Sequence, residues 1–184
     1  MLAIRVFYSA ILSLFFFSSG VWTTPLPVPR TVDGDVLLSR NHPPIPSLAE
    51  METHLHVPAD ASLFYSCDQL GQGTCKQAKT WAKTNHPTYK VLGQMWTNSN
   101  YPTPWQADPA VSKQFFDVAS QAMAELSSGT VYVVLGPWTH ADGKDWYDQS
   151  VWARMEWPAL EANHNVKTIY RVNAATGVTI KIKG

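Results

Sequence analysis

Apolar side chains between residues 109 and 126 recur at the spacing of one face of an α-helix. Asp108 can cap the first turn, and Pro109 suits the first helical position because its missing N–H is not needed there. We expect the helix to end at Ser127-Ser128-Gly129, with Gly129 as the C-cap. The apolar positions are Val111, Phe115, Val118, Ala119, Ala122, Met123 and Leu126.

Three runs rich in β-branched residues follow this predicted helix. Residues 130–135 read Thr-Val-Tyr-Val-Val-Leu, a run continuous enough for a strand that is buried on both faces. Residues 166–172 and 178–182 predict two further strands, separated by a turn at residues 173–177. Helix and strands at this spacing predict an α/β lobe over residues 109–184, with a small and largely parallel sheet flanked by helices.

The preceding part of the chain has a more helical pattern. Residues 76–84 predict a helix that Asn-His-Pro at 85–87 ends, and residues 89–96 predict a second short helix. Residues 63–66, Leu-Phe-Tyr-Ser, are a short apolar stretch, and residues 98–108 read as a loop. The fold class is therefore α/β, with a helical lobe (48–108) packed on the second lobe in a single domain, 48–184.

The first 47 residues lack this periodicity. Residues 1–20 predict a secretory signal peptide, because Arg5 precedes an apolar run and small residues end it; a signal anchor is the alternative. Residues 21–47 are rich in proline and predict an extended segment. We expect a secreted chain without a membrane span. In that compartment Cys67 and Cys75 would form a local disulfide, a metal site being the alternative.

Composition excludes some partners and suggests others. Lys and Arg number 14, Asp and Glu also number 14, and the formal net charge is zero, so the sequence predicts no nucleic-acid partner. Eight Trp, seven Tyr and seven Phe indicate either an ordinary core or a cleft lined with rings. No pattern predicts an oligomeric state.

Candidate chemistry is sparse. The sequence holds no phosphate-binding loop, dinucleotide fingerprint, nucleophile elbow or His-Glu-x-x-His motif. His54 and His56 favour an exposed polar segment over a pair of metal ligands. The Asp-rich loop favours a solvated loop over a calcium site. Glu156 stands out because it lies among large apolar residues, where a carboxylate is either ion-paired or functional. Its available partners are Arg154 and Lys167. The loop in question holds His140, Asp142, Asp145 and Asp148.

A longer series of segments carries a family resemblance. It begins at 115–120, Phe-Phe-Asp-Val-Ala-Ser, continues through Met-Ala-Glu at 123–125 and the strand at 130–135, and resumes at 156–160, Glu-Trp-Pro-Ala-Leu, and at 166–169. In order and spacing these segments resemble the ADP-ribosyl cyclase/NAD glycohydrolase family of animal ecto-enzymes. Residues 63–66 add a weaker match. The chain is identified as a divergent secreted member.

The resemblance implies roles for individual residues. Glu156 matches the catalytic glutamate, and Ser120 the serine that contacts the reacting ribose. Phe116 and Tyr65 stand where the family has stacking tryptophans, with Ser66 beside Tyr65 as a phosphate contact. Trp152 is a further expected wall of the substrate pocket.

The implied substrate is NAD, with no cofactor and no metal. Departure of nicotinamide leaves an oxocarbenium-like ribosyl centre, which a single carboxylate can stabilise. Water then gives ADP-ribose, and attack by the adenine gives cyclic ADP-ribose. The family's second acidic residue has no counterpart near residues 88–92, where Gln94 is the nearest polar candidate. The alternatives are a catalytically inactive secreted binding or effector protein on the same fold, and an unrelated secreted enzyme such as a nuclease or a glycan hydrolase.

Overall fold

The computed structural model describes residues 42–66, 74–136 and 146–184. The chain divides into two compact units, Met1–Leu38 and Ser39–Gly184, and the described residues belong to the second. The predicted signal peptide, most of the proline-rich segment and Cys67 lie outside them. Residues 42–47 have no regular structure, as expected, and they contact the domain, since the indole Nε1 of Trp105 donates to the carbonyl of Pro43 at 3.0 Å.

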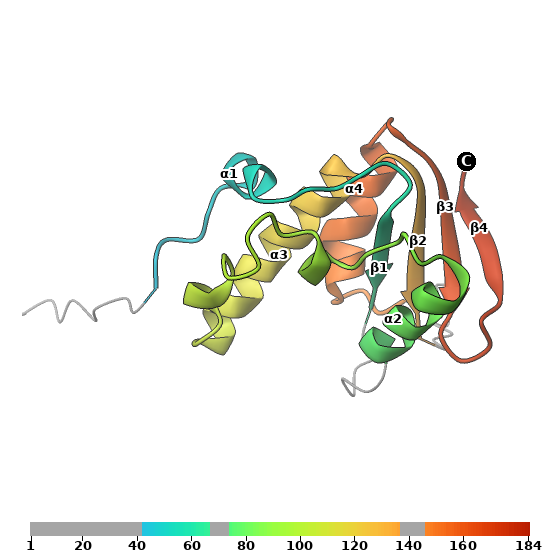
Figure 1. The fold of residues 1–184 in the computed structure, drawn as a ribbon, viewed down its shortest axis with the longest axis horizontal. Coiled ribbons are helices and arrows are strands. Elements are labelled where there is room, and N and C mark those ends of the chain that lie inside the picture. Colours follow the sequence, from blue (N-terminus) through green and yellow to red (C-terminus); the bar gives the residue numbers. More distant parts are fainter. Residues whose placement is uncertain (1–41, 67–73, 137–145) are drawn as a thin grey trace, which may run out of the picture. The chain divides into compact units, whose positions relative to one another are not determined.

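A four-stranded sheet forms the centre of the domain (Figure 1). Its strands are β1 (Ser62–Tyr65), β2 (Gly129–Leu135), β3 (Val166–Asn173) and β4 (Thr179–Lys183), and they lie side by side in this order. The pairs β1–β2 and β2–β3 are parallel, and β3–β4 is antiparallel. The predicted fold class, α/β with a small and largely parallel sheet flanked by helices, is confirmed.

Helices cover both faces of this sheet (Figure 1). Because side chains alternate along a strand, Val131 and Val133 of β2 belong to one hydrophobic core and Val134 to the other. The first core also contains buried residues of α1 (Leu48–Thr53), α3 (Pro109–Leu126) and α4 (Trp157–Ala162), and the second those of α2 (Thr74–Asn85). The two 3₁₀ turns are η1 (Leu92–Gln94) and η2 (Thr103–Trp105).

Helix α3 begins as predicted and ends differently. The Asp108 carboxylate accepts a hydrogen bond from the backbone N–H of Ala110 at 2.8 Å, and Pro109 opens the first turn. The C-cap, however, is Ser127, so the prediction of Gly129 as the cap was wrong. Gly129 has a φ of +73° and begins β2, where an added Cβ would overlap the Asp60 carboxylate. This close approach requires glycine.

The predicted helix at residues 89–96 is not present. Only the short turn η1 forms there. The backbone of Lys90 instead joins the outer edge of β1, accepting from the N–H of Leu63 at 3.0 Å and donating to the carbonyl of Ala61 at 2.7 Å. These bonds replace the intrahelical ones that a helix would need. The N-terminal half, expected to be mainly helical, therefore also contributes one strand and an edge segment to the sheet.

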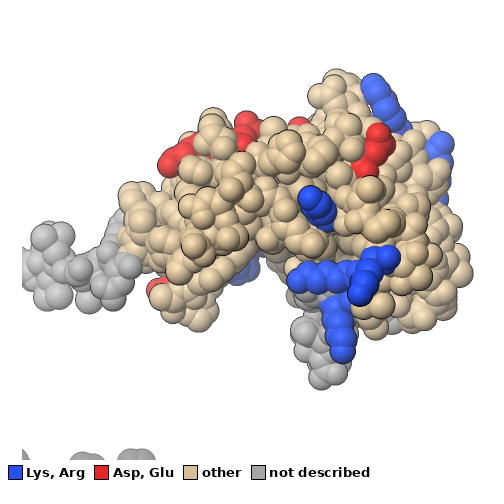
Figure 2. Space-filling model, viewed as in Figure 1, with Lys and Arg blue, Asp and Glu red and all other residues tan. Residues whose placement is uncertain are grey.

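Charge is distributed unevenly over the domain. Lysine and arginine side chains gather over α2 in Figure 2, and Lys76, Lys79 and Lys83 of that helix are exposed. The zero net charge of the chain therefore conceals a local basic face. Within the described residues, no helix has the length and apolar character that crossing a membrane requires.

Candidate active site

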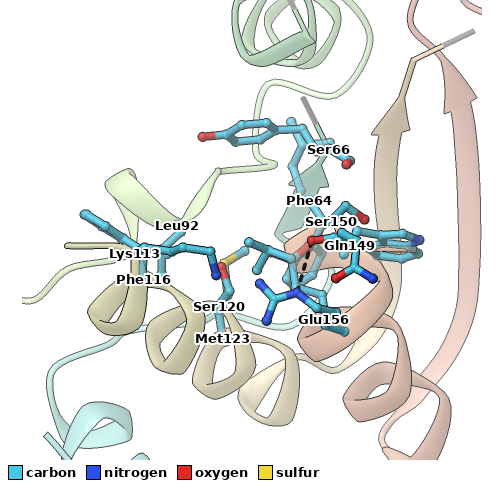
Figure 3. Close-up of a pocket in the computed structure, with 15 residues that line it drawn as sticks. Phe64, Ser66, Leu92, Lys113, Phe116, Ser120, Met123, Gln149, Ser150 and Glu156 are labelled. Carbon is cyan, nitrogen blue, oxygen red and sulfur yellow. Dashed lines mark hydrogen bonds between the residues drawn. The ribbon is translucent and has the colours of Figure 1, made fainter. Parts of the chain in front are cut away.

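A cavity of about 370 Å³ opens between β1, α3 and the segment that precedes α4. It lies beside the carboxyl end of the parallel strand β1, the usual position for ligands in open α/β sheets. Figure 3 shows Phe116, Ser120 and Met123 of α3 on one side, Glu156 on the facing helix and Ser66 near the strand end. The lining residues are Leu63, Phe64, Tyr65, Ser66, Leu92, Lys113, Phe116, Ser120, Met123, Gln149, Ser150, Val151, Trp152, Arg154 and Glu156.

All six residues that the sequence predicts for catalysis or substrate binding line this one cavity. They come from three segments that are far apart in the chain: β1, the middle of α3, and the turn before α4. Their roles in catalysis or binding stay predictions. The six are Tyr65, Ser66, Phe116, Ser120, Trp152 and Glu156.

Glu156 is the buried carboxyl group of the cavity. Only 6% of the residue is exposed, and its side chain is hydrogen-bonded to the side chain of Ser120. Its second oxygen, Oε2, is buried and has no hydrogen-bond partner among the described residues. Burial raises the pKa of Glu156 to about 8, the hydrogen bond from Ser120 opposes this rise, and the nearby Asp117 charge adds to it. At neutral pH the empty site therefore favours the protonated form.

A π-helical turn, η3 (Trp152–Glu156), carries this carboxyl group into the cavity. The backbone N–H of Trp157 donates to the carbonyl of Trp152, five residues earlier. Pro158 explains the wide turn, because it has no N–H to donate and its ring would clash with the carbonyl of residue 154 in an α-helix. Single π turns of this kind are rare and frequently occur at functional sites.

Aromatic rings pack around the cavity-lining residue Trp152. Trp152 is fully buried, and its ring packs at 5.8 Å from Trp157, 6.2 Å from Trp146 and 6.2 Å from Phe64, measured between centroids. Trp152 is thus a packed wall that also belongs to the hydrophobic core. Phe116 is half-buried on α3 and packs edge-on against Phe115 at 5.3 Å.

The predicted ion-pair partners of Glu156 were wrong. The Nη2 atom of Arg154 donates to both carboxylate oxygens of Asp117, at 3.1 and 3.0 Å, and Lys167 donates to the carbonyl of His164 at 2.9 Å. Asp117 precedes Ser120 by one helical turn, and this spacing is the sequence signal that could have linked it to the site. Sequence reasoning also missed Leu92, Lys113, Met123 and Gln149 as lining residues.

Several other predictions fall outside the cavity or outside the described residues. Gln94, considered as a substitute for the family's second acid, does not line the cavity, and its side chain accepts from the N–H of Val91 at 3.2 Å. The ring of His54 stacks on Tyr101 at 3.7 Å. Among the described residues no three His, Cys, Asp or Glu side chains are grouped to hold a metal ion. The Cys67–Cys75 disulfide and the loop residues His140, Asp142 and Asp145 lie outside the residues described at side-chain level, whereas Asp148 lies within them.

Comparison with known proteins gives partial structural likenesses. No family model matches the chain, and no curated protein does. Among solved structures it resembles Aplysia cyclase complexed with the substrate NGD and the product cGDPR, at 15% identity and a TM-score of 0.42 over 63% of this chain and 49% of that one. It also resembles porcine CD38 with a covalent intermediate, at 16% identity and a TM-score of 0.43 over 65% and 55% of the two chains. The chain thus spans about half the length of these proteins.

Proposed function

We propose that this protein cleaves NAD, releasing nicotinamide and forming ADP-ribose, cyclic ADP-ribose or both. One observation carries the proposal. Six residues chosen from three separate sequence segments line a single cavity, and the only one of them with a carboxyl group, Glu156, is buried in it against Ser120. A sizeable, mostly apolar cavity with a few polar groups and a perturbed carboxyl is a common form of active site.

The raised pKa of Glu156 suits a substrate that brings its own positive charge. The pyridinium of NAD is cationic, and a cation close to a carboxyl group favours the ionised form. Binding would therefore help to ionise Glu156, and the carboxylate would then stabilise the oxocarbenium-like centre left by nicotinamide. Ser120, already hydrogen-bonded to Glu156, would help to hold the carboxylate and could contact the ribose.

The set of carboxylates supports this chemistry over glycan hydrolysis. Glu156 is the only Asp or Glu among the described residues that line the cavity. Its neighbour Asp117 is bonded to both Arg154 and Lys113. Most glycosidases use two carboxyl groups, about 5–10 Å apart, one of which must protonate the leaving oxygen. Nicotinamide leaves as a neutral molecule and needs no such acid.

Aromatic side chains would hold the flat rings of the substrate. Phe116 and Tyr65 line the cavity from opposite elements, α3 and β1, and both are half-buried. Such rings can stack on the pyridinium and on adenine through π and cation–π contacts. Adenine held near the ribosyl centre would favour cyclisation, and water entering there would favour hydrolysis. We further propose that the protein acts outside the cell, as its predicted signal peptide implies.

A catalytically inactive binding protein on the same fold is the second candidate. It is favoured by the smaller rings, Tyr65 and Phe116, at positions where the resembling family has tryptophan. Such a protein would bind NAD or a related nucleotide in the same cavity and leave it intact.

Product analysis distinguishes these candidates. The purified secreted protein is incubated with NAD at pH 8.5, which lies above the pKa of about 8 of Glu156 and so favours its ionised form even before substrate binds, and the products are separated by chromatography. Nicotinamide with ADP-ribose or cyclic ADP-ribose is the expected result. Intact NAD that nevertheless binds, measured by calorimetry on protein with a cooperative unfolding transition, supports the second candidate. Absence of both cleavage and binding contradicts both.

A further inference from the structure

An ion pair joins α3 to η3 directly beside the cavity. The Nη2 atom of Arg154 donates to both carboxylate oxygens of Asp117, at 3.1 and 3.0 Å, and its Nε donates to the carbonyl of Gln149 at 3.1 Å. Lys113 adds a third contact to Asp117 at 2.9 Å. The Asp117 side chain is only 14% exposed and that of Arg154 31%. A fixed and partly buried pair of this kind stabilises more than an ordinary surface pair.

On both α3 and η3, the ion pair between Asp117 and Arg154 lies close in the chain to the hydrogen bond between Ser120 and Glu156. Asp117 precedes Ser120 by three residues on α3, so both face the same side of that helix. Arg154 precedes Glu156 by two residues within the same π turn. The two interactions therefore connect the same two helical segments at neighbouring points. The π turn ends at Glu156, so a contact that anchors Arg154 within that turn bears directly on where the Glu156 side chain lies.

We propose that Asp117 and Arg154 are positioning residues, which act together to hold the carboxyl group of Glu156 against Ser120. The inference rests on the proposed function for its kinetic consequences. Neither residue forms a hydrogen bond or an ion pair with Glu156 itself: Asp117 is not among the cavity-lining residues and acts on Glu156 only through its charge, and Arg154 is held by Asp117 and by the carbonyl of Gln149.

Kinetic measurements can distinguish a positioning role of Arg154 from direct contact with the substrate. Arg154 lines the cavity, so a phosphate contact would raise KM when Arg154 is changed and would leave Asp117 irrelevant. A positioning pair makes the two residues equivalent, because either change breaks the same link. It also predicts loss in kcat, since a displacement of the catalytic group by about 1 Å can cost on the order of 100-fold in rate.

The kinetic experiment uses Asp117→Asn, Arg154→Gln, the double variant and the charge swap Asp117→Arg with Arg154→Asp. Each single variant should lower kcat about 10- to 100-fold with KM changed less than about threefold, and the double variant should be no worse than either. The swap should recover most of kcat. Glu125→Gln is the matched control: it removes a carboxylate from the same helix, where the Glu125 side chain is exposed and, within the described residues, accepts a hydrogen bond only from Gln121. A raised KM in Arg154→Gln alone, or additive losses in the double variant, overturns the proposal.

A second readout does not require enzyme activity. The carboxyl carbon of Glu156 is titrated by NMR in the wild-type protein and in the double variant Asp117→Asn with Arg154→Gln. The double variant loses one charge of each sign, and Lys113 on α3 and Ser120 remain near the carboxyl group. Loss of the Asp117 charge alone lowers the pKa of Glu156 slightly, because that charge is the smallest of the causes that shift it. If the pair positions Glu156, the freed carboxyl also reaches water, and its pKa falls much further, from about 8 toward the ordinary 4.5. An unchanged pKa overturns the inference. If the wild-type protein cleaves no NAD, the proposed function fails while this titration still decides the inference.

Discussion

The C-terminal end of α3 and its middle contrast in how their polar groups are satisfied. At the C-terminal end, the hydroxyl of Ser127 donates to the carbonyl of Met123 and bonds the hydroxyl of Ser62, each at 2.7 Å. The amide of Asn163 donates there to the carbonyls of residues 124, 125 and 127. At the middle of α3, Ser120 meets Glu156, whose Oε2 has no partner among the described residues. Buried polar groups are satisfied almost everywhere in folded proteins, so a buried carboxyl oxygen without a partner calls for an explanation, and a catalytic role is one of those known.

The two ends of α4 repeat this contrast. After its last turn, the ammonium group of Lys183 donates to the carbonyls of Leu160, Glu161 and Asn163, at 2.6, 3.0 and 3.0 Å. A cation suits the carbonyl end of a helix. Immediately before its first turn lies Glu156, with a single hydrogen bond and a raised pKa. The well-satisfied groups and the poorly satisfied carboxyl group thus lie at opposite ends of α4.

The largest change expected from a single substitution is at Trp152. Trp152→Ala should lower the free energy of unfolding by about 3–5 kcal/mol, because it removes a fully buried indole from the core as well as from the cavity wall. Urea denaturation measures this loss, with Trp152→Phe retaining most of the stability as the control. Wild-type stability in Trp152→Ala would contradict the packing described for the cavity side.

Glu156 should make the domain less stable as pH rises. Its pKa rises from 4.5 to about 8 on folding, so between these values the folded state keeps a proton that the unfolded state has lost. Stability therefore falls by about 1.4 kcal/mol per pH unit over this range. Glu156→Gln should not show this fall and should exceed the wild type by about 3 kcal/mol at pH 7, with the difference vanishing below pH 4.5. Parallel curves of stability against pH for the two proteins would refute the burial of an isolated carboxyl group.

At the C-terminal end of α3, Asn163→Ala should cost about 2 kcal/mol of stability, because it leaves partly buried carbonyls without their side-chain donor. The kcat for nicotinamide release should stay at the wild-type value. Thermal unfolding together with a rate measurement tests both parts. A loss of kcat without a loss of stability would remove the distinction between the C-terminal end of α3 and its middle.

A smaller effect is expected in the pH profile of the wild-type enzyme. Since kcat/KM reports groups of the free enzyme, it should rise about tenfold per pH unit below pH 8 and then level off, as Glu156 ionises. Initial rates at NAD concentrations below KM give this profile. A flat profile between pH 6 and 9 would mean that another group, or none, controls the reaction.

The sequence predicted best what depends on local pattern. The long helix α3 and the strands β2, β3 and β4 follow from periodicity, β-branched residues and a capping Asp108. It failed at residues 89–96, where helical spacing was overridden by backbone pairing of Lys90 with β1, a contact between segments far apart in the chain. The predicted C-cap of α3 was wrong for a similar reason, because a glycine is required at position 129 by the close approach of Asp60 and not by the end of the helix.

The residues of the candidate site also divide into those that the sequence could predict and those that it could not. Glu156 and Ser120 could be selected from the sequence because they match positions of the family motif, and their roles stay predictions. The pair of Asp117 with Arg154 could not, since it depends on how η3 packs against α3. The π turn likewise follows from Pro158 only once the chain is known to be helical there. Long-range packing therefore supplies the arrangement of the site, and local sequence supplies its chemical groups.

The most direct test of the account is the kcat for nicotinamide release by the wild-type protein, Glu156→Gln and Glu161→Gln, measured with an NAD analogue that fluoresces on cleavage. Glu161 is a matched control, because it is an exposed glutamate on α4, close to Glu156 in the chain. The account predicts that Glu156→Gln loses ~10²–10⁴-fold in kcat with little change in binding, and that Glu161→Gln keeps the wild-type rate. Equal rates in all three proteins would contradict it.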